Sequence, residues 1–138
     1  WRDKKNTRLA FKDGWFRTGD AGYLDKDNFL YITDRLKDMI ISGGENIASL
    51  ELERVIQQMP EVQEVAVVGI PDAKWGEVPA AVIVWKAGEA VDIGSLRKHC
   101  GEHLAAFKIP KKLVVSDSLP RNPSGKLLKR LIRQQLEP

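Results

Sequence analysis

The sequence has few cysteines and histidines: Cys100 is the single cysteine among 138 residues, beside two histidines. One cysteine excludes an intramolecular disulfide, so we expect a protein of the reducing cytoplasm. No apolar run approaches the roughly 20 residues that cross a bilayer, and no secretory signal is recognisable. Repeats, low-complexity segments and a Ser/Thr/Gly-rich phosphate loop are also missing. These absences argue against disulfide-stapled scaffolds, membrane-spanning proteins and repeat proteins.

The charge of the chain is nearly balanced. Lys and Arg number 22 against 19 Asp and Glu, which gives a formal net charge of +3. That excess is too small to indicate a nucleic-acid-binding protein. Hydrophobic residues make up 43% of the chain, enough for one modest core or a core with an appended piece. Residue 1 is Trp rather than Met, and residues 1–10 show neither a helix cap nor a core face, so we expect a fragment of a longer protein.

The apolar pattern predicts strands and helices in a mixed order. Strands are predicted at 15–17, 29–33, 39–42, 65–70, 79–85 and 112–115. Helices are predicted from Ser49 as N-cap to Pro60, from 93 to 104 with Asp92 as N-cap, and over 127–136. This order indicates an α+β fold, in which residues 37–138 form a small domain with a short β-sheet packed by about three helices. A β-rich segment, residues 1–36, precedes that domain.

Two polar side chains near the predicted junction are candidates for nucleotide contact. Asp20 follows a glycine at the end of a predicted strand, where its carboxylate could accept hydrogen bonds from two vicinal ribose hydroxyls. Arg35 could bind ribose oxygens or phosphate bidentately. Taken singly, each has a simpler explanation, as a turn aspartate and a surface arginine. Lys37 lies in the connector, where its backbone would absorb dihedral changes if the two parts move.

Gly43 and Gly44 separate a predicted strand from a predicted helix. Without Cβ atoms they permit close approach of an extended ligand, although a tight turn is an equally common reason for such a pair. Trp75 and Phe107 are expected to pack or to lie at the surface, and either ring could instead stack on an adenine.

Lys126 is the strongest candidate for chemistry. It follows a turn that contains Pro123 and Gly125 and precedes a basic helix, which suits an ammonium group presented to an oxyanion or a phosphate. A Walker-type phosphate loop is excluded because it needs glycine at 120 and Ser or Thr at 127, where the chain has Pro120 and Leu127. The apolar face of the last predicted helix is expected to dock on its own domain rather than on a membrane or RNA.

His99, Cys100 and His103 lie within about one helical turn and could mimic a metal-binding cluster. The sequence offers no second cysteine pair, and we identify no carboxylate at ligand spacing, so core or surface roles are expected instead. We therefore predict that the chain has no metal site.

In collinear order, these motifs resemble those of the adenylate-forming superfamily, which includes acyl-CoA synthetases, adenylation domains of peptide synthetases and luciferases. The resemblance spans nearly the whole chain. The matching segments are 14–20, 34–47 with 51–53, 65–72, 75–77, 107–110 and 120–126. Two departures are visible: Ala48-Ser49 stands where many relatives have an aromatic residue and proline, and Asn28 replaces a common glycine.

The resemblance implies a two-step ligase. A carboxylic acid reacts with ATP to give an acyl-adenylate and pyrophosphate, and the thiol of coenzyme A then displaces AMP while a mobile C-terminal domain, here 37–138, rotates between the steps. Residues 1–36 would be the incomplete end of a large N-terminal domain that holds most of the ATP and Mg²⁺ site. Each candidate residue then receives a role. Asp20 and Arg35 would bind the nucleotide, Lys37 would be the hinge, Lys126 would be catalytic, and Gly43, Gly44, Trp75, Phe107, Lys108 and Lys111 would contact coenzyme A.

The resemblance favours a fatty acid as the substrate. An aryl-acid or peptide-synthetase adenylation enzyme is the alternative, and a non-catalytic nucleotide- or protein-binding module is another. The isolated chain is expected to be inactive, because the reaction also needs the large N-terminal domain of the same protein. That domain is therefore the first expected partner. A protein acetyltransferase acting on Lys126 is a further expected partner, since acylation would remove the charge that the first step needs. No nucleic-acid partner and no transmembrane segment are expected.

Overall fold

The computed structural model describes residues 2–136 and divides the chain into two compact units, Trp1–Lys37 and Asp38–Pro138. This division differs by one residue from the predicted boundary between 36 and 37. Each unit is described by itself.

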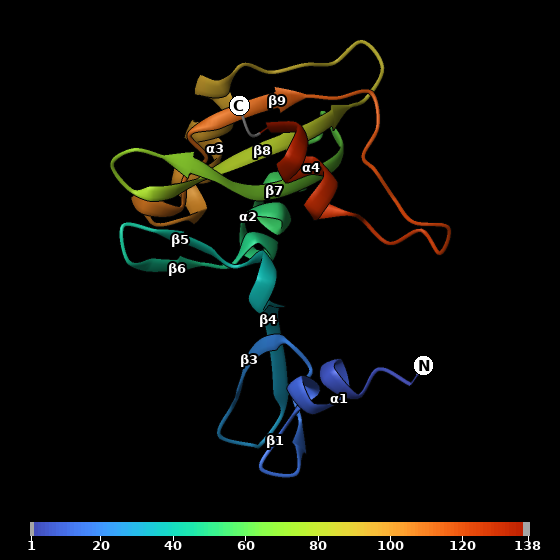
Figure 1. The fold of residues 1–138 in the computed structure, drawn as a ribbon. Coiled ribbons are helices and arrows are strands. Elements are labelled where there is room, and N and C mark those ends of the chain that lie inside the picture. Colours follow the sequence, from blue (N-terminus) through green and yellow to red (C-terminus); the bar gives the residue numbers. More distant parts are fainter. Residues whose placement is uncertain (1, 137–138) are drawn as a thin grey trace. The chain divides into compact units, whose positions relative to one another are not determined.

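The first unit holds one short helix and two small antiparallel sheets (Figure 1). Its elements are α1 (Lys4–Ala10), β1 (Phe11–Lys12), β2 (Trp15–Phe16), β3 (Asp20–Leu24) and β4 (Leu30–Arg35). The expectation that residues 1–10 carry no helix cap is wrong. The Asp3 carboxylate accepts a hydrogen bond from the Asn6 N–H at 2.9 Å, which satisfies one of the free donors at the start of α1.

The β3–β4 turn explains why glycine suits position 28. Asn28 has a φ of 63°, a left-handed conformation that asparagine tolerates better than most residues with a side chain. The Asp25 carboxylate closes the turn by accepting the N–H groups of Asp27 and Phe29, both at 2.9 Å. The hydrogen bond from Phe29 holds the pKa of Asp25 below its ordinary value. The replacement of glycine by Asn28 therefore leaves the turn conformation intact.

Large apolar side chains of the first unit are exposed. Trp15 is 80% exposed and Phe29 is 67% exposed, and several neighbours on the two hairpins are similar. Apolar surface of this extent is unusual in a protein unit on its own and is usually covered by another protein surface.

The second unit is built around a five-stranded sheet with the order β6-β5-β8-β7, in which β9 also pairs with β8. The β8–β9 pairing is parallel and the others are antiparallel. The short turn η1 (Leu36–Asp38) leads into this unit. Its elements are β5 (Ile40–Ser42), β6 (Glu45–Ile47), α2 (Ser49–Ile56), β7 (Val62–Asp72), β8 (Gly76–Trp85), α3 (Ile93–His103), η2 (Ala106–Lys108), β9 (Lys112–Val115) and α4 (Lys129–Leu136).

Side-chain alternation along β7 and β8 divides the apolar residues between two cores, one on each face of the sheet. Val67 and Ile83 belong to the core shared with α2 and α3, whereas Val68 and Val82 belong to the core covered by α4 (Figure 1). The predicted α+β fold, a short sheet packed by helices, is thereby confirmed. So is the docking of the last helix on its own unit, since Ile132 is 2% exposed.

The predicted helix starts are right in one case and wrong in two. Asp92 caps α3 as predicted: its carboxylate accepts the Ser95 N–H at 2.9 Å, and this bond lowers the pKa of Asp92. Ser49 is not an N-cap, because Ala48 holds that position and the buried Ser49 hydroxyl accepts a hydrogen bond from the Lys129 ammonium at 2.6 Å. The last helix begins at Lys129 rather than at 127.

Candidate functional site

Asp20 and Arg35 face each other across the β3–β4 hairpin as paired residues. The Arg35 Nε lies 2.9 Å from the Asp20 Oδ1, and the Arg35 Nη1 donates to the Thr18 carbonyl at 3.0 Å. The side chain of Asp20 remains 26% exposed. Asp20 also lines an open hollow of about 470 Å³ together with residues 16–19 and Leu36. The structure therefore brings these two predicted nucleotide residues together and leaves part of the carboxylate accessible to a polar ligand.

Lys37 is the last residue of the first unit and lies in the turn η1. Its side chain is exposed. The Leu36 N–H just before it donates to the Gly19 carbonyl at 2.8 Å, so the hydrogen bonding of the first unit ends next to Lys37.

The glycine pair forms the two-residue turn of the β5–β6 hairpin. Gly43 has φ 59° and Gly44 has φ 88°, the pair of positive values that a type I′ turn requires. The Gly43 N–H donates to the Trp75 carbonyl at 2.8 Å, and a Cβ on Gly43 would lie 2.7 Å from the Trp75 ring. Gly44 has open space at the same position. The tight-turn explanation is therefore correct for both residues, and close approach to Trp75 is an added requirement at Gly43.

A pocket of about 150 Å³ lies beside this turn. It is lined from three segments that are distant in sequence: the β5–β6 turn, the β7–β8 turn, and η2 with the residues that follow it. Its lining residues are Ser42, Gly43, Glu45, Trp75, Phe107 and Lys111. Four residues predicted to contact coenzyme A thus meet at one hollow, where two half-exposed aromatic rings stand near a lysine.

Lys108 has a different environment. Its ammonium contacts both carboxylate oxygens of Glu51 at 2.7 Å, which ties η2 to α2. Lys108 and Gly44 are not among the lining residues of the pocket. In this conformation, the charge of Lys108 is directed to Glu51.

Lys126 ends a tight turn that starts at Asn122. The Asn122 carboxamide oxygen accepts the Lys126 N–H at 2.8 Å, and the Asn122 N–H donates to the Lys126 carbonyl at 2.9 Å. Gly125 has φ 81° and supplies the left-handed residue of the turn. The Lys126 side chain is exposed, and within residues 2–136 its ammonium group makes no hydrogen bond or ion pair.

Ion pairs on both sides hold this turn to the domain. Arg121, before the turn, contacts the Glu64 carboxylate of β7 at 2.5 Å and the Gly125 carbonyl at 2.9 Å. Lys129, after the turn, contacts the Glu53 carboxylate of α2 at 2.7 Å. The structure thus presents an uncompensated positive charge at the tip of a braced loop.

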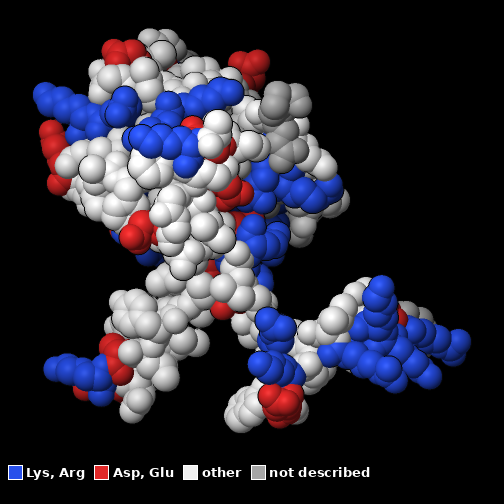
Figure 2. Space-filling model, turned by 60° about the vertical axis from the view of Figure 1, so that its left-hand side comes forward, with Lys and Arg blue, Asp and Glu red and all other residues white. Residues whose placement is uncertain are grey.

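Charge is mixed over the remainder of the second unit. On the face of the second unit shown in Figure 2, blue Lys and Arg side chains are interrupted by white and red ones. None of the helices within residues 2–136 is long and apolar enough to span a membrane.

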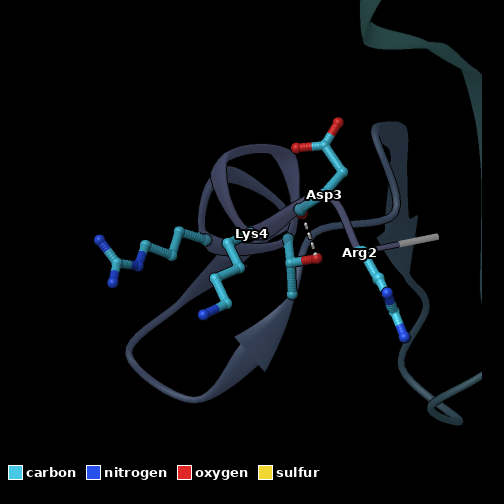
Figure 3. A pocket seen from close by; sticks show the side chains of 5 residues that line it. Arg2, Asp3 and Lys4 are labelled. Carbon is cyan, nitrogen blue, oxygen red and sulfur yellow. Dashed lines mark hydrogen bonds between the residues drawn. The ribbon is translucent and has the colours of Figure 1, made fainter.

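Another hollow, of about 300 Å³, lies at the start of α1 (Figure 3). Arg2, Asp3, Lys4, Thr7 and Arg8 line it. The side chains of Arg2 and Lys4 point away from each other in Figure 3, and Asp3 is engaged as the helix cap. These residues offer no convergent set of ligand groups.

Comparison with known proteins identifies the family of the chain. Residues 51–126 match the family model of the AMP-binding enzyme C-terminal domain. The chain belongs to this family.

Similar proteins include named CoA ligases. A long-chain-fatty-acid–CoA ligase, FadD13 of Mycobacterium tuberculosis, is 52% identical over 98% of this chain and 27% of its own length. A 2-succinylbenzoate–CoA ligase of Listeria monocytogenes is 48% identical over 96% of this chain and 28% of its own length. The solved structure of o-succinylbenzoate CoA synthetase from Bacillus subtilis, in complex with the acyl-adenylate intermediate, has a TM-score of 0.88 and 46% identity over 99% of this chain and 27% of that one. The chain thus spans just over a quarter of the length of these relatives.

Three polar residues around the pocket beside Gly43 were not predicted from the sequence. Ser42 and Glu45 line the pocket, and the Lys74 ammonium lies 4.6 Å from the centroid of the Trp75 ring. The signal was available, since Ser42 and Glu45 flank the glycine pair and Lys74 precedes Trp75. Their significance depends on the contact between two turns, which the sequence does not encode locally.

The histidines of α3 are a different case, because the carboxylate beside them stands at a helical spacing that is visible in the sequence. Cys100 points into the core, and burial raises its pKa to about 11. The statement that no carboxylate stands at ligand spacing is wrong, because Glu102 lies with His99 and His103 in a group that could hold an ion.

Proposed function

We propose that this chain is the C-terminal part of an AMP-forming acyl-CoA ligase. The full-length enzyme would convert a carboxylic acid, ATP and coenzyme A into acyl-CoA, AMP and pyrophosphate through an acyl-adenylate. Three findings support this proposal: the family of the chain, the names of its relatives, and the acyl-adenylate bound to one of them. The observation that carries it is the free Lys126 ammonium on a loop braced by two ion pairs.

Lys126 would act in the adenylation step. Attack of a carboxylate on the α-phosphate of ATP brings two anions together and builds charge on the phosphoryl oxygens. A positioned ammonium stabilises that charge, and a lysine without a competing carboxylate is available for it. The two flanking ion pairs matter because a flexible loop would not hold the Lys126 ammonium in the position on which such catalysis depends.

The pocket beside Gly43 would receive coenzyme A in the second step. Trp75 and Phe107 offer apolar and aromatic surface for the adenine or the pantetheine arm, and Lys111 offers a positive charge for a phosphate. Lys108 could join this site if its pairing with Glu51 opened. Gly44 would keep the turn narrow where the thiol passes.

Asp20 and Arg35 would hold the nucleotide from the other unit. The exposed part of the Asp20 carboxylate would accept the ribose hydroxyls while Arg35 fixes its orientation. Lys37 would be the hinge between two arrangements, in which either Lys126 or the pocket serves the reaction. Mg²⁺ and most of the ATP site would come from the portion of the relatives that lies outside this chain.

The exposed apolar side chains of residues 1–36 support the remaining part of the proposal. We assign this segment to the end of a large N-terminal domain, whose other residues would cover Trp15 and Phe29. Residues 37–138 would be the mobile C-terminal domain. The isolated chain would then be inactive, because the acyl pocket and the phosphate loop would lie in that large N-terminal domain.

A fatty acid is the proposed substrate, based on the 52% identity to the long-chain ligase. The 48% identity to the 2-succinylbenzoate ligase favours an aryl acid as the second candidate. Competition between a long-chain fatty acid and 2-succinylbenzoate, measured by acyl-CoA formation with the full-length enzyme, would decide between them. The exposed Lys126 is also accessible to a protein acetyltransferase, and its acylation would remove the charge required for adenylation.

Lys126→Ala in the full-length enzyme tests the proposal. Adenylation, measured by pyrophosphate release, should fall by about a hundred- to a thousandfold, whereas thioester formation from supplied acyl-adenylate should be largely retained. Lys98→Ala, an exposed lysine on α3, is the matched control and should affect neither step. Equal losses in both half-reactions would contradict the role given to Lys126, and full activity would refute it.

A further inference from the structure

The last turn of α3 carries three side chains of the kinds that bind metal ions. His99, Glu102 and His103 stand at positions i, i+3 and i+4, which places them on one side of the helix. One ligand atom from each residue lies within 4.8 Å of the other two. His99 and His103 are the two histidines of the chain. No step of the proposed ligase reaction uses this cluster.

The ring of His99 is already oriented by a second helix. Its Nε2 lies 2.9 Å from the carbonyl oxygen of Val55 in α2. A carbonyl oxygen can only accept, so Nε2 carries the hydrogen, and Nδ1 is the nitrogen that offers a lone pair in the neutral imidazole. Metal-binding histidines show this arrangement, in which one ring N–H donates to a backbone carbonyl and the other nitrogen binds the ion.

The surroundings favour a cation over other occupants. The cluster lies at the C-terminal end of α3, where the helix dipole is negative, and Glu102 adds a formal negative charge. His99 is partly buried, whereas Glu102 and His103 are exposed and can adjust their rotamers around an ion. Cys100 is not a ligand, since its side chain is buried in the apolar core.

We propose that His99, Glu102 and His103 form a binding site for a divalent late transition metal ion, with Zn²⁺ as the prototype. Imidazole nitrogens select such ions over Mg²⁺ and Ca²⁺, which prefer sets of oxygen ligands. Three protein ligands leave at least one coordination position for water. Because His99 is hydrogen-bonded to α2, the bound ion ties the end of α3 to α2 and stabilises the folded chain. This proposal departs from the sequence-based prediction of no metal and does not depend on the ligase proposal.

Zn²⁺ titration of a tag-free, chelator-treated chain tests the site. Calorimetry should show one saturable equivalent, and the melting temperature should rise with Zn²⁺ concentration. His103→Ala alters an exposed side chain and so spares the fold, and it should weaken binding by about tenfold or more, with a smaller loss for Glu102→Gln. Glu89→Gln, another exposed carboxylate, is the matched control and should bind Zn²⁺ like the wild type.

Co²⁺ provides a spectroscopic readout of the ligands. The Co²⁺-loaded chain should show visible absorption bands without an intense thiolate-to-cobalt band in the near ultraviolet. A thiolate band would assign the ion to Cys100 and overturn the proposal. The proposal is also overturned if the wild type shows no saturable Zn²⁺ binding, or if His103→Ala binds Zn²⁺ as tightly as the wild type.

Discussion

Loss of the Lys129–Glu53 ion pair should destabilise the second unit strongly. The Lys129 ammonium lies 2.7 Å from the Glu53 carboxylate, and the two side chains are 10% and 13% exposed. The same carboxylate oxygen accepts the N–H of Val67 at 2.7 Å, on the side of β7 that has no neighbouring strand. Lys129→Met keeps much of the side-chain volume but leaves the nearly buried Glu53 carboxylate without its cation.

The cost follows from this burial. Removal of one partner of a buried ion pair costs about 3–5 kcal/mol, because the remaining charge stays in a poorly solvated place. The residual exposure of both side chains allows some water to approach, which favours the lower end, about 3 kcal/mol. Lys126→Met makes the same chemical change at an exposed position three residues earlier and should alter the free energy of unfolding by less than about 0.5 kcal/mol.

Urea denaturation of the two variants measures the difference. Adding Glu53→Gln to Lys129→Met removes the charge that Lys129 compensated and keeps a side-chain oxygen that can accept the Val67 N–H, so the double variant should recover part of the lost stability. A loss below about 1 kcal/mol for Lys129→Met, matching that of Lys126→Met, would refute a stabilising role for the pair. A double variant less stable than Lys129→Met would show that the negative charge of Glu53, once Lys129 is lost, is not the cause.

Two further predictions concern a turn and a helix cap. Gly43→Ala should lower the free energy of unfolding by about 1–3 kcal/mol and slow thioester formation in the full-length enzyme, since the new methyl group meets the Trp75 ring at a positive φ. Gly44→Ala has the positive φ without the contact and should lower the free energy of unfolding by less. Equal losses in urea denaturation would count against the Trp75 contact. The Ser95 N–H lowers the pKa of Asp92 in the folded chain, so the resulting stabilisation is present above the ordinary pKa of 3.8 and is lost as pH falls through the folded value. Asp92→Asn keeps the cap but does not titrate, so thermal melts from pH 6 to pH 2.5 should show a smaller loss of stability than in the wild type, and parallel curves would contradict this.

Some features of the chain were predictable because neighbouring residues decide them. The Asp92 cap is one, because the carboxylate and the N–H that it accepts are three residues apart. The β7 and β8 strands are another, since their apolar runs exceed what a turn or an exposed helix would carry. Ser49 has the local features of a cap as well, but Lys129, 80 residues later, takes its hydroxyl. Local pattern reading fails where a distant partner offers a stronger interaction.

The α+β fold, the family and the turn that presents Lys126 were predictable from the residues alone, because these depend on short-range periodicity, on glycine and proline positions, and on motifs in a fixed order. Which candidates lie together followed from the three-dimensional packing. It gathered Gly43, Trp75, Phe107 and Lys111 at one pocket and directed Lys108 to Glu51. It also set His99 against α2 beside Glu102 and His103. The reason is physical: contacts between segments tens of residues apart form only when burial of the two cores brings the helices and turns onto the sheet.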